Sequence, residues 1–133
     1  MSGEHVETLR VAYEAWNRGD LDALRDIYAP NVTASAGELW PAGGEVSGAD
    51  AIIGAFASIL EMFQHSELVA ERFIDHGESV VVPTIWRGTL HDSASVIEQR
   101  VVAVYIFRGK QVVRIEYFEH LDQALERIGG PES

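Results

Sequence analysis

The sequence predicts an α+β fold in which the helices come first and a largely antiparallel sheet follows. Apolar residues recur at three- and four-residue steps up to Phe63, which is typical of amphipathic helices. Beyond His65 the chain changes to β-rich runs joined by the short turns "DHGE" and "RGK". The 133 residues suffice for one domain with a real core, so we expect a single domain over residues 1–133.

The first predicted helix runs from Glu4 to Arg18 and presents one apolar stripe. Its stripe consists of Val6, Leu9, Tyr13 and Trp16. Gly19 is expected to end this helix in a left-handed conformation, and Asp20 to start a second helix as its N-cap. The second helix is expected to bury Leu21, Leu24, Ile27 and Tyr28 and to end at Pro30.

A third helix follows "GEVSGAD", with Asp50 in its first turn, where an acidic group favours the helix dipole. Its buried side is expected to be Ile52, Phe56, Ile59, Leu60 and Phe63. A short closing helix is predicted in "HLDQALERIG" near the end of the chain.

Five segments are predicted as strands because they are rich in β-branched and aromatic residues. They are residues 32–36, 68–74, 79–90, 96–107 and 112–118. The intervening "GELWPAGGEVSG" reads as a Gly/Pro-rich loop that carries Trp40.

Composition excludes several classes of function. The net charge of −11 repels phosphate backbones and anionic lipid surfaces, so neither nucleic acid nor a membrane is an expected partner. The chain has no cysteine, hence no disulfide, thiol nucleophile or thiolate metal site. No secretory signal is recognisable at the N-terminus, and no apolar run approaches the ~20 residues of a membrane span, so we expect a cytoplasmic protein.

The last two strands form a hairpin whose register decides which side chains share a face. A two-residue turn at Arg108 and Gly109 would place Tyr105 opposite Val112. The pairing of the two strands would continue from there, away from the turn. One face would then carry Gln99, Val101, Ala103, Tyr105, Val112, Arg114, Glu116 and Phe118. This mixed set is typical of a cavity wall. The opposite, apolar face suits a subunit interface, which predicts a homodimer through the sheet. It would carry Arg100, Val102, Val104, Ile106, Val113, Ile115 and Tyr117.

In this register Arg114 and Glu116 lie close enough to pair, and two interpretations follow. The pair is either a partly buried ion pair that satisfies both charges, or a carboxylate held for proton transfer beside an arginine. In the second interpretation Glu116 is a general base, and Tyr105 and Arg114 donate hydrogen bonds to a developing oxyanion.

Three stretches of the chain resemble the SnoaL-like branch of the nuclear transport factor 2-like superfamily. They are "AYEAWNRGDLDALRDIYAPNV", "SGADAIIGAF" and "RGKQVVRIEYFE", and the likeness extends over nearly the whole chain. The resemblance implies a cone-shaped α+β barrel, with helices packed on a strongly curved sheet that encloses a pocket. It also implies a dimer through the outer side of that sheet. Characterised members include polyketide cyclases, ketosteroid isomerases and limonene-type epoxide hydrolases, so the fold alone does not define a reaction.

Two catalytic sets of that superfamily are incomplete in this chain. The Asp base and the protonated acid of ketosteroid isomerases fall at Ala36 and Ala103, and their helical Tyr falls at Ala12, beside Tyr13. The closing acid of limonene-type epoxide hydrolases matches Glu116, but their Arg and second Asp fall at Thr84 and Trp86.

Several side chains are candidates for contact with an apolar ligand. They are Tyr13, Trp16, Trp40, Trp86, Gln99, Val101, Ala103 and Phe118. Most aromatic residues at helical spacing belong to a core, whereas Trp40 lies in a loop that could close over a ligand. The five histidines lack the spacing of a metal site, and no dinucleotide or phosphate-binding motif is present, so neither metal nor cofactor is expected.

Two functions remain open at this point. One is a cofactor-independent enzyme of the polyketide-cyclase or isomerase type, acting on an apolar carbonyl compound through Glu116. The other is a non-catalytic module of the same fold, which binds a ligand in the cone or a partner on its sheet.

Overall fold

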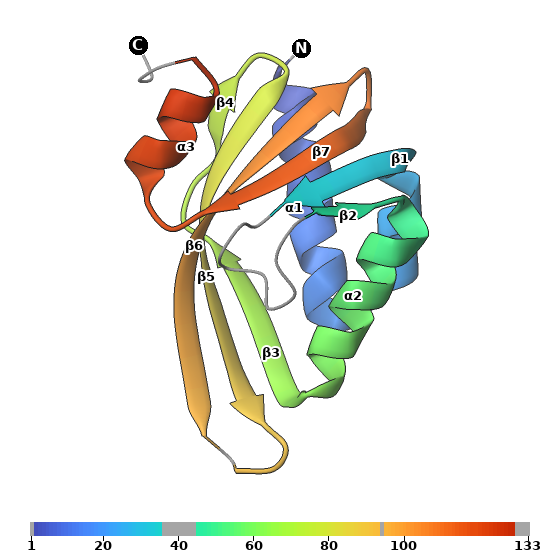
Figure 1. Ribbon diagram of the computed structural model, residues 1–133, viewed down its shortest axis with the longest axis vertical. Helices are drawn as coiled ribbons and strands as arrows, with labels where there is room; N and C mark the ends of the chain where they lie inside the picture. The colour runs from blue at the N-terminus through green and yellow to red at the C-terminus, as the bar shows by residue number, and fades with distance from the viewer. Residues whose placement is uncertain (1, 36–44, 94, 130–133) are drawn as a thin grey trace.

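The computed structural model describes residues 2–35, 45–93 and 95–129. Two helices, α1 (Ser2–Arg18) and α2 (Ala49–Glu61), pack on one face of a curled seven-stranded sheet (Figure 1). The short helix α3 (Leu121–Arg127) lies on the other face. The prediction of helices packed on a strongly curved, mainly antiparallel sheet is confirmed, and the sheet is curled without closing into a barrel.

The sheet has the strand order β2-β1-β7-β6-β5-β3, with β4 paired to β5 beside β3. Its strands are β1 (Tyr28–Ser35), β2 (Glu45–Ser47), β3 (Phe63–Ala70), β4 (Ile74–His76), β5 (Ser79–Leu90), β6 (Val96–Arg108) and β7 (Gln111–Phe118). The pairing of β1 with β7 is parallel, and the other pairings are antiparallel. Strands β5 and β6 are the longest, and their far ends project beyond α2 (Figure 1).

The first predicted helix is confirmed, since α1 ends at Arg18 and Gly19 has a φ of 77°. The second prediction is wrong in extent, because residues Leu21–Asp26 form only a 3-10 helix, η1, and Asp20 makes no side-chain capping bond. Tyr28 and Pro30 belong to β1 instead. The physical reason is tertiary pairing: Tyr28 pairs with Val112 of β7, and Pro30 lies in the irregular stretch of that ladder, where a missing N–H is tolerated.

The third predicted helix is confirmed as α2, with Ile52 and Phe56 buried. Phe63, expected on its buried side, instead begins β3. The ring of Phe63 packs against Gly88 of β5, where a Cβ atom would lie only 2.6 Å from the Phe63 Cδ1 atom. A glycine at position 88 therefore permits this close approach of β5 to β3.

The two faces of the sheet bury separate sets of apolar side chains. The larger core joins α1, α2, η1 and the inner face of the sheet, and includes Leu9, Phe56, Val82, Tyr105 and Ile115. The smaller core lies between the outer face and α3, and includes Val81, Val102, Val104 and Ala124. Successive residues of β5 and β6 alternate between the two cores, as strand geometry requires.

The β6–β7 hairpin differs from the predicted register in two ways. Arg108 pairs with Gln111, so the turn consists of Gly109 and Lys110, and Gly109 adopts a φ of 63°. Phe107 then pairs with Val112 but Ile106 pairs with Arg114, which leaves Val113 as an extra residue, a β-bulge. The turn lies one residue later than predicted, which moves each cross-strand partner by two residues. This shift alone would leave the same side chains together on each face. The bulge adds one residue and exchanges the faces of β7.

As a result, the mixed cavity wall predicted from the hairpin does not form. The inner core contains Ala103 and Tyr105 of β6 together with Val112, Ile115 and Tyr117 of β7. Phe118 packs instead against the smaller core on the outer face. Ile115 and Tyr117, expected on an outer apolar face, are therefore interior residues. Val102, Val104 and Ile106 do lie on the outer face, where they pack with α3.

Helix α1 is attached to the sheet near its N-terminus through His5. The His5 ring stacks on Phe107 at a centroid distance of 4.0 Å. Its Nδ1 atom lies 3.2 Å from the Gly77 carbonyl oxygen and its Nε2 atom 3.0 Å from the Gly109 carbonyl oxygen. One side chain thus joins α1 to both the β4–β5 turn and the β6–β7 turn.

Near its other end, α1 covers the edge of β3 through Asn17. The Asn17 Nδ2 atom donates to the Leu68 carbonyl oxygen at 2.9 Å, and the Leu68 N–H donates to Asn17 Oδ1 at 2.7 Å. The side-chain amide pairs with the strand as another strand would, which protects the edge from pairing with other chains.

We expect Asn17→Ala to lower the free energy of unfolding by about 1 kcal/mol, because two hydrogen bonds at an exposed position are lost. Urea denaturation measures the change. Asn31→Ala, at an exposed position of β1, is the control. Equal stabilities of the two variants would show that the Asn17 amide contributes nothing at this edge.

Candidate functional site

A chain of three buried hydroxyl groups crosses the interior between α1 and the inner face of the sheet. The Tyr13 hydroxyl lies 2.8 Å from Thr84 Oγ1, and the Tyr105 hydroxyl donates to the Tyr13 oxygen at 3.2 Å. The Thr84 hydroxyl donates in turn to the Val82 carbonyl oxygen at 2.9 Å. These side chains come from α1, β5 and β6, so the chain of hydrogen bonds depends on how the helix packs on the sheet.

Burial keeps these phenols protonated. Desolvation raises the pKa of Tyr13, and its hydrogen bonds with Thr84 and Tyr105 only partly oppose that effect. Desolvation also raises the pKa of Tyr28 and places the pKa of Tyr105 well above 10.0. At neutral pH the interior therefore presents neutral hydroxyl groups, which can hydrogen-bond but cannot act as bases.

The indole of Trp16 is the second polar feature of the interior. Its Nε1 atom is buried and has no hydrogen-bond partner within residues 2–35, 45–93 and 95–129. The ring itself packs edge-on against Phe56 at 5.0 Å. Buried indole N–H groups usually have a partner, so an unpaired one needs an explanation such as a bound water or ligand.

The predicted acid lies on the other side of the sheet. Glu116 is 7% exposed and faces α3, where Arg127 Nε is 2.7 Å from its Oε1 atom. That N–H is not directed at the oxygen, so the contact is an ion pair without a hydrogen bond. Arg114 Nε donates to the other carboxylate oxygen, Oε2, at 2.6 Å.

Arg114 extends this ion pair to the strands at the edge of the sheet. Its Nη1 atom lies 2.8 Å from both Thr33 Oγ1 and Glu45 Oε2. The hydrogen bond to Glu116, followed by the one to Glu45, raises the pKa of Arg114 despite partial desolvation. The result is an ionic cluster that joins β7 to β1, β2 and α3, which fits the interpretation of a partly buried ion pair.

The three residues proposed for catalysis therefore do not converge. Glu116 and Arg114 lie on the outer face, whereas Tyr105 lies in the inner core. The bulge at Val113 is the physical reason, because it exchanges the faces of β7 relative to β6.

The proposed ligand contacts do not all lie together. Tyr13, Trp16 and Ala103 lie together in the inner core. Trp86, Gln99 and Val101 continue the same face along β5 and β6, where the Trp86 N–H already donates to Ser66 Oγ at 2.8 Å. Phe118 is on the outer face, and Trp40, like Ala36, lies outside the described residues.

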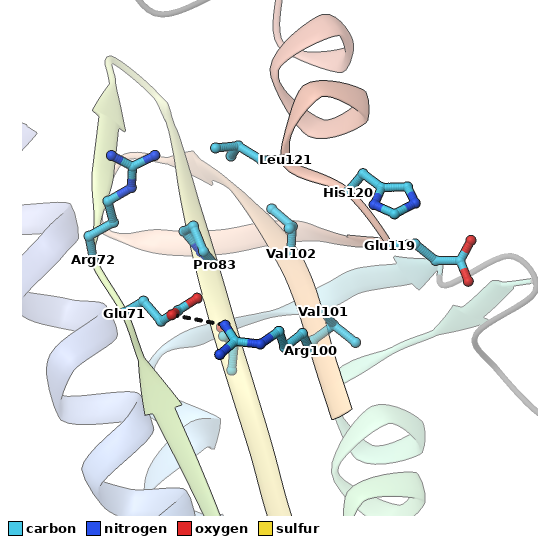
Figure 2. A pocket seen from close by; sticks show the side chains of 10 residues that line it. Glu71, Arg72, Pro83, Arg100, Val101, Val102, Glu119, His120 and Leu121 are labelled. Carbon is cyan, nitrogen blue, oxygen red and sulfur yellow. Dashed lines mark hydrogen bonds and ion pairs between the residues drawn. The ribbon is translucent and has the colours of Figure 1, made fainter. Parts of the chain in front are cut away.

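A groove of about 420 Å³ lies beside the start of α3 (Figure 2). Its walls are Glu71, Arg72, Pro83, Thr84, Arg100, Val101, Val102, Glu119, His120 and Leu121. Arg100 donates to Glu71 at 3.0 Å across it, and Figure 2 shows the Glu119 carboxylate directed away from that pair. Only Val101 was among the sequence candidates, because exposed charges on strand ends carry no pattern that indicates a groove.

Two further features bear on the kind of site. Within the described parts of the chain, no group of three or more His, Asp or Glu side chains is placed to hold a metal ion. None of the described helices is long and apolar enough to cross a membrane.

We expect Glu116→Gln to lower the free energy of unfolding by about 1–3 kcal/mol, because Arg114 and Arg127 would both lose a buried counter-charge. Glu45→Gln is the matched control, since it removes an exposed partner of the same Arg114 and should change stability by at most ~0.5 kcal/mol. Chemical denaturation compares the two. A loss for Glu45→Gln as large as that for Glu116→Gln would contradict a structural role centred on the buried carboxylate.

Solved structures share this architecture. A protein of Jannaschia sp. CCS1 named a SnoaL-like polyketide cyclase aligns with a TM-score of 0.78 and 21% identity, covering 98% of this chain and 95% of that one. A Catenulispora acidiphila DSM 44928 protein with a ketosteroid isomerase-like fold aligns at 0.75 and 18%, covering 94% of both chains. TerC aligns at 0.76 and 18%, covering 92% of this chain and 96% of its own. At these identities the likeness shows the fold alone.

No curated protein matches the sequence. The family model of the SnoaL-like domain does match, over residues 9–115, which extend from α1 into β7. The match therefore includes both long strands and all three members of the hydroxyl chain. The chain belongs to the SnoaL-like domain family.

Proposed function

We propose that the chain binds a small, largely apolar molecule with a carbonyl group in its interior, and that the Trp16 N–H holds that carbonyl. The observation that carries the proposal is the buried Trp16 Nε1 atom without a partner among the described residues. It lies in a core of aliphatic and aromatic side chains, where the carbonyl of a bound molecule would supply the missing acceptor.

The relatives are consistent with small-molecule binding. The Catenulispora protein was solved in complex with trimethylamine, and TerC was co-crystallised with polyporic acid. The name of the Jannaschia protein denotes a polyketide cyclase.

Of the two functions that the sequence left open, the geometry favours ligand binding without acid–base catalysis. Proton abstraction next to a carbonyl requires a base within hydrogen-bond reach of the substrate. Among the described residues, the buried polar or charged side chains other than Tyr and Trp are Thr84 and Glu116, and Glu116 is on the outer face. The interior hydroxyls are held protonated by burial, so they do not supply a base that could remove a proton.

We expect Trp16→Phe to weaken binding of 1-tetralone about 3- to 10-fold, because one neutral hydrogen bond contributes about 0.5–1.5 kcal/mol. Binding of naphthalene, which has the same two-ring size but no carbonyl, should change little. Calorimetric titration of both compounds against the wild type and the variant measures the difference.

Trp86→Phe is the control for loss of an indole, because the Trp86 N–H is already bonded to Ser66. It should leave the ratio of 1-tetralone to naphthalene affinity unchanged. Equal effects of Trp16→Phe on both compounds would show that the N–H does not hold the carbonyl. Failure of the wild type to bind either compound would refute the proposal altogether.

A further inference from the structure

The first half of β6 forms an edge of the sheet that has no partner strand in the described parts of the chain. Strand β7 pairs with β6 only from Val102 to Arg108, because β7 ends at Phe118. Residues 96–101 therefore pair with β5 on one side and with no described strand on the other. Figure 1 shows this part of β6 at the margin of the molecule.

The strands at the ends of the sheet are short or covered, unlike this edge. Strands β2 and β4 have 3 residues each, and the Asn17 amide occupies the edge of β3 at Leu68. Natural sheets usually protect a longer edge with proline, lysine or a bulge. The stretch "VIEQRV" of residues 96–101 has no Pro or Lys, and its ladder with β5 is regular. Such an edge favours the addition of another strand.

A backbone hydrogen bond shows which groups of β6 face this edge. The Phe107 N–H donates to the Glu78 carbonyl oxygen at 2.8 Å, so odd-numbered residues of β6 direct their backbone groups toward β5. The backbone groups of successive strand residues point to opposite sides, and β6 has no irregularity against β5. The N–H and C=O groups of Val96, Glu98 and Arg100 therefore point toward the open edge.

The side chains of this edge are complementary to one another. Glu98 and Arg100 carry opposite charges and lie on either side of Gln99. In an antiparallel pair of two β6 edges with a two-fold axis at Gln99, Glu98 of each copy lies opposite Arg100 of the other. The same axis places Ile97, which is 36% exposed, opposite Val101. Opposite charges and apolar pairs stabilise an antiparallel pairing, whereas an axis at Glu98 would oppose two like charges.

We infer that the edge of β6 over residues 97–101 binds the same edge of a second copy of the chain, antiparallel, about a two-fold axis at Gln99. Glu98 of one copy and Arg100 of the other then exchange backbone hydrogen bonds. The pairing stops before Val102, whose edge is occupied by Phe118. Because the paired stretch is short, we expect the dimer to depend on protein concentration.

This interface differs from the apolar outer face for which the sequence predicts a dimer. On that face, Val102 and Val104 already pack with α3. The inference also goes beyond the proposed function, because it involves none of the side chains of the inner core.

Cysteine cross-linking tests the position of the axis, because the chain itself has no cysteine. Opposed residues that do not exchange hydrogen bonds have Cα atoms about 4.5 Å apart in an antiparallel pair, within the range of a disulfide. Gln99→Cys should therefore give a disulfide-linked dimer on mild oxidation. Glu98→Cys is the control, since its two copies would be diagonal neighbours about 7–8 Å apart, too far for a disulfide.

Glu98→Pro should weaken the dimer and preserve the fold. The Glu98 N–H points to the open edge, so a proline there removes no hydrogen bond to β5. By symmetry the dimer loses two hydrogen bonds, and its dissociation constant should rise about 5- to 100-fold in sedimentation equilibrium. Circular dichroism and the melting temperature establish that the variant is folded.

Two charge variants test the complementarity and decide the question if Glu98→Pro does not fold. Arg100→Glu and Glu98→Arg each place like charges opposite one another in a dimer of identical copies. Each variant alone should therefore dimerise more weakly than the wild type. A mixture of the two restores opposite charges in both pairs. With Gln99→Cys added to each, mass spectrometry should find the mixed disulfide in excess over either homodimer.

Three results would overturn the inference. The first is a wild type that stays monomeric at every concentration, and slow hydrogen exchange of the Glu98 and Arg100 amides would then show that another part of the same chain covers the edge. The second is a dimer as strong in Glu98→Pro as in the wild type, because another surface would then hold the copies together. The third is a disulfide that forms in Glu98→Cys and not in Gln99→Cys, which would place the axis elsewhere.

Discussion

The extra residue at Val113 in the β6–β7 ladder determines how polar groups are distributed over the two faces of the sheet. Before the bulge, Phe107 and Val112 pair in the inner core. Beyond it, Ile115 and Tyr117 continue the inner face, while Arg114 and Glu116 lie on the outer face, where Glu116 pairs with Arg127 of α3. Because side chains alternate with a period of two, a single inserted residue suffices to move every later side chain of β7 to the opposite face.

This arrangement keeps the ionic groups away from the hydroxyl chain. An ionised carboxylate inside the aromatic core would lose its hydration, at a cost of several kcal/mol that a single partner rarely offsets. On the outer face Glu116 has two arginines, and both arginines are partly exposed to solvent. The inner core can therefore be built from neutral groups alone, and Tyr13, Thr84 and Tyr105 satisfy one another there.

The periodicity of apolar residues predicted the helices and strands that have a long amphipathic or β-branched pattern. Helix α1, helix α2 and the strands β5 and β6 were predicted within a few residues, because a long amphipathic or β-branched run is formed by the segment itself. The second helix was overestimated because Tyr28 pairs with Val112, far away in the sequence, and that pairing outweighs helix propensity.

The candidate site was predicted only in part for a related reason. Tyr13, Trp16 and Ala103 were placed in the interior by their spacing, and the structure brings them together with Tyr105. Glu116 was misplaced because nothing in "KQVVRIEYF" indicates that Val113 is unpaired. A bulge arises from the fit between two strands and the elements on either side, which the residues of one strand do not encode.

The neutrality of the inner core also limits what it can hold. A ligand that entered as an anion would meet no counter-charge among the buried side chains described there, and the net charge of −11 would oppose its approach. A cation would be attracted at long range but would lose its hydration in a core whose phenols stay protonated. A neutral molecule avoids both costs.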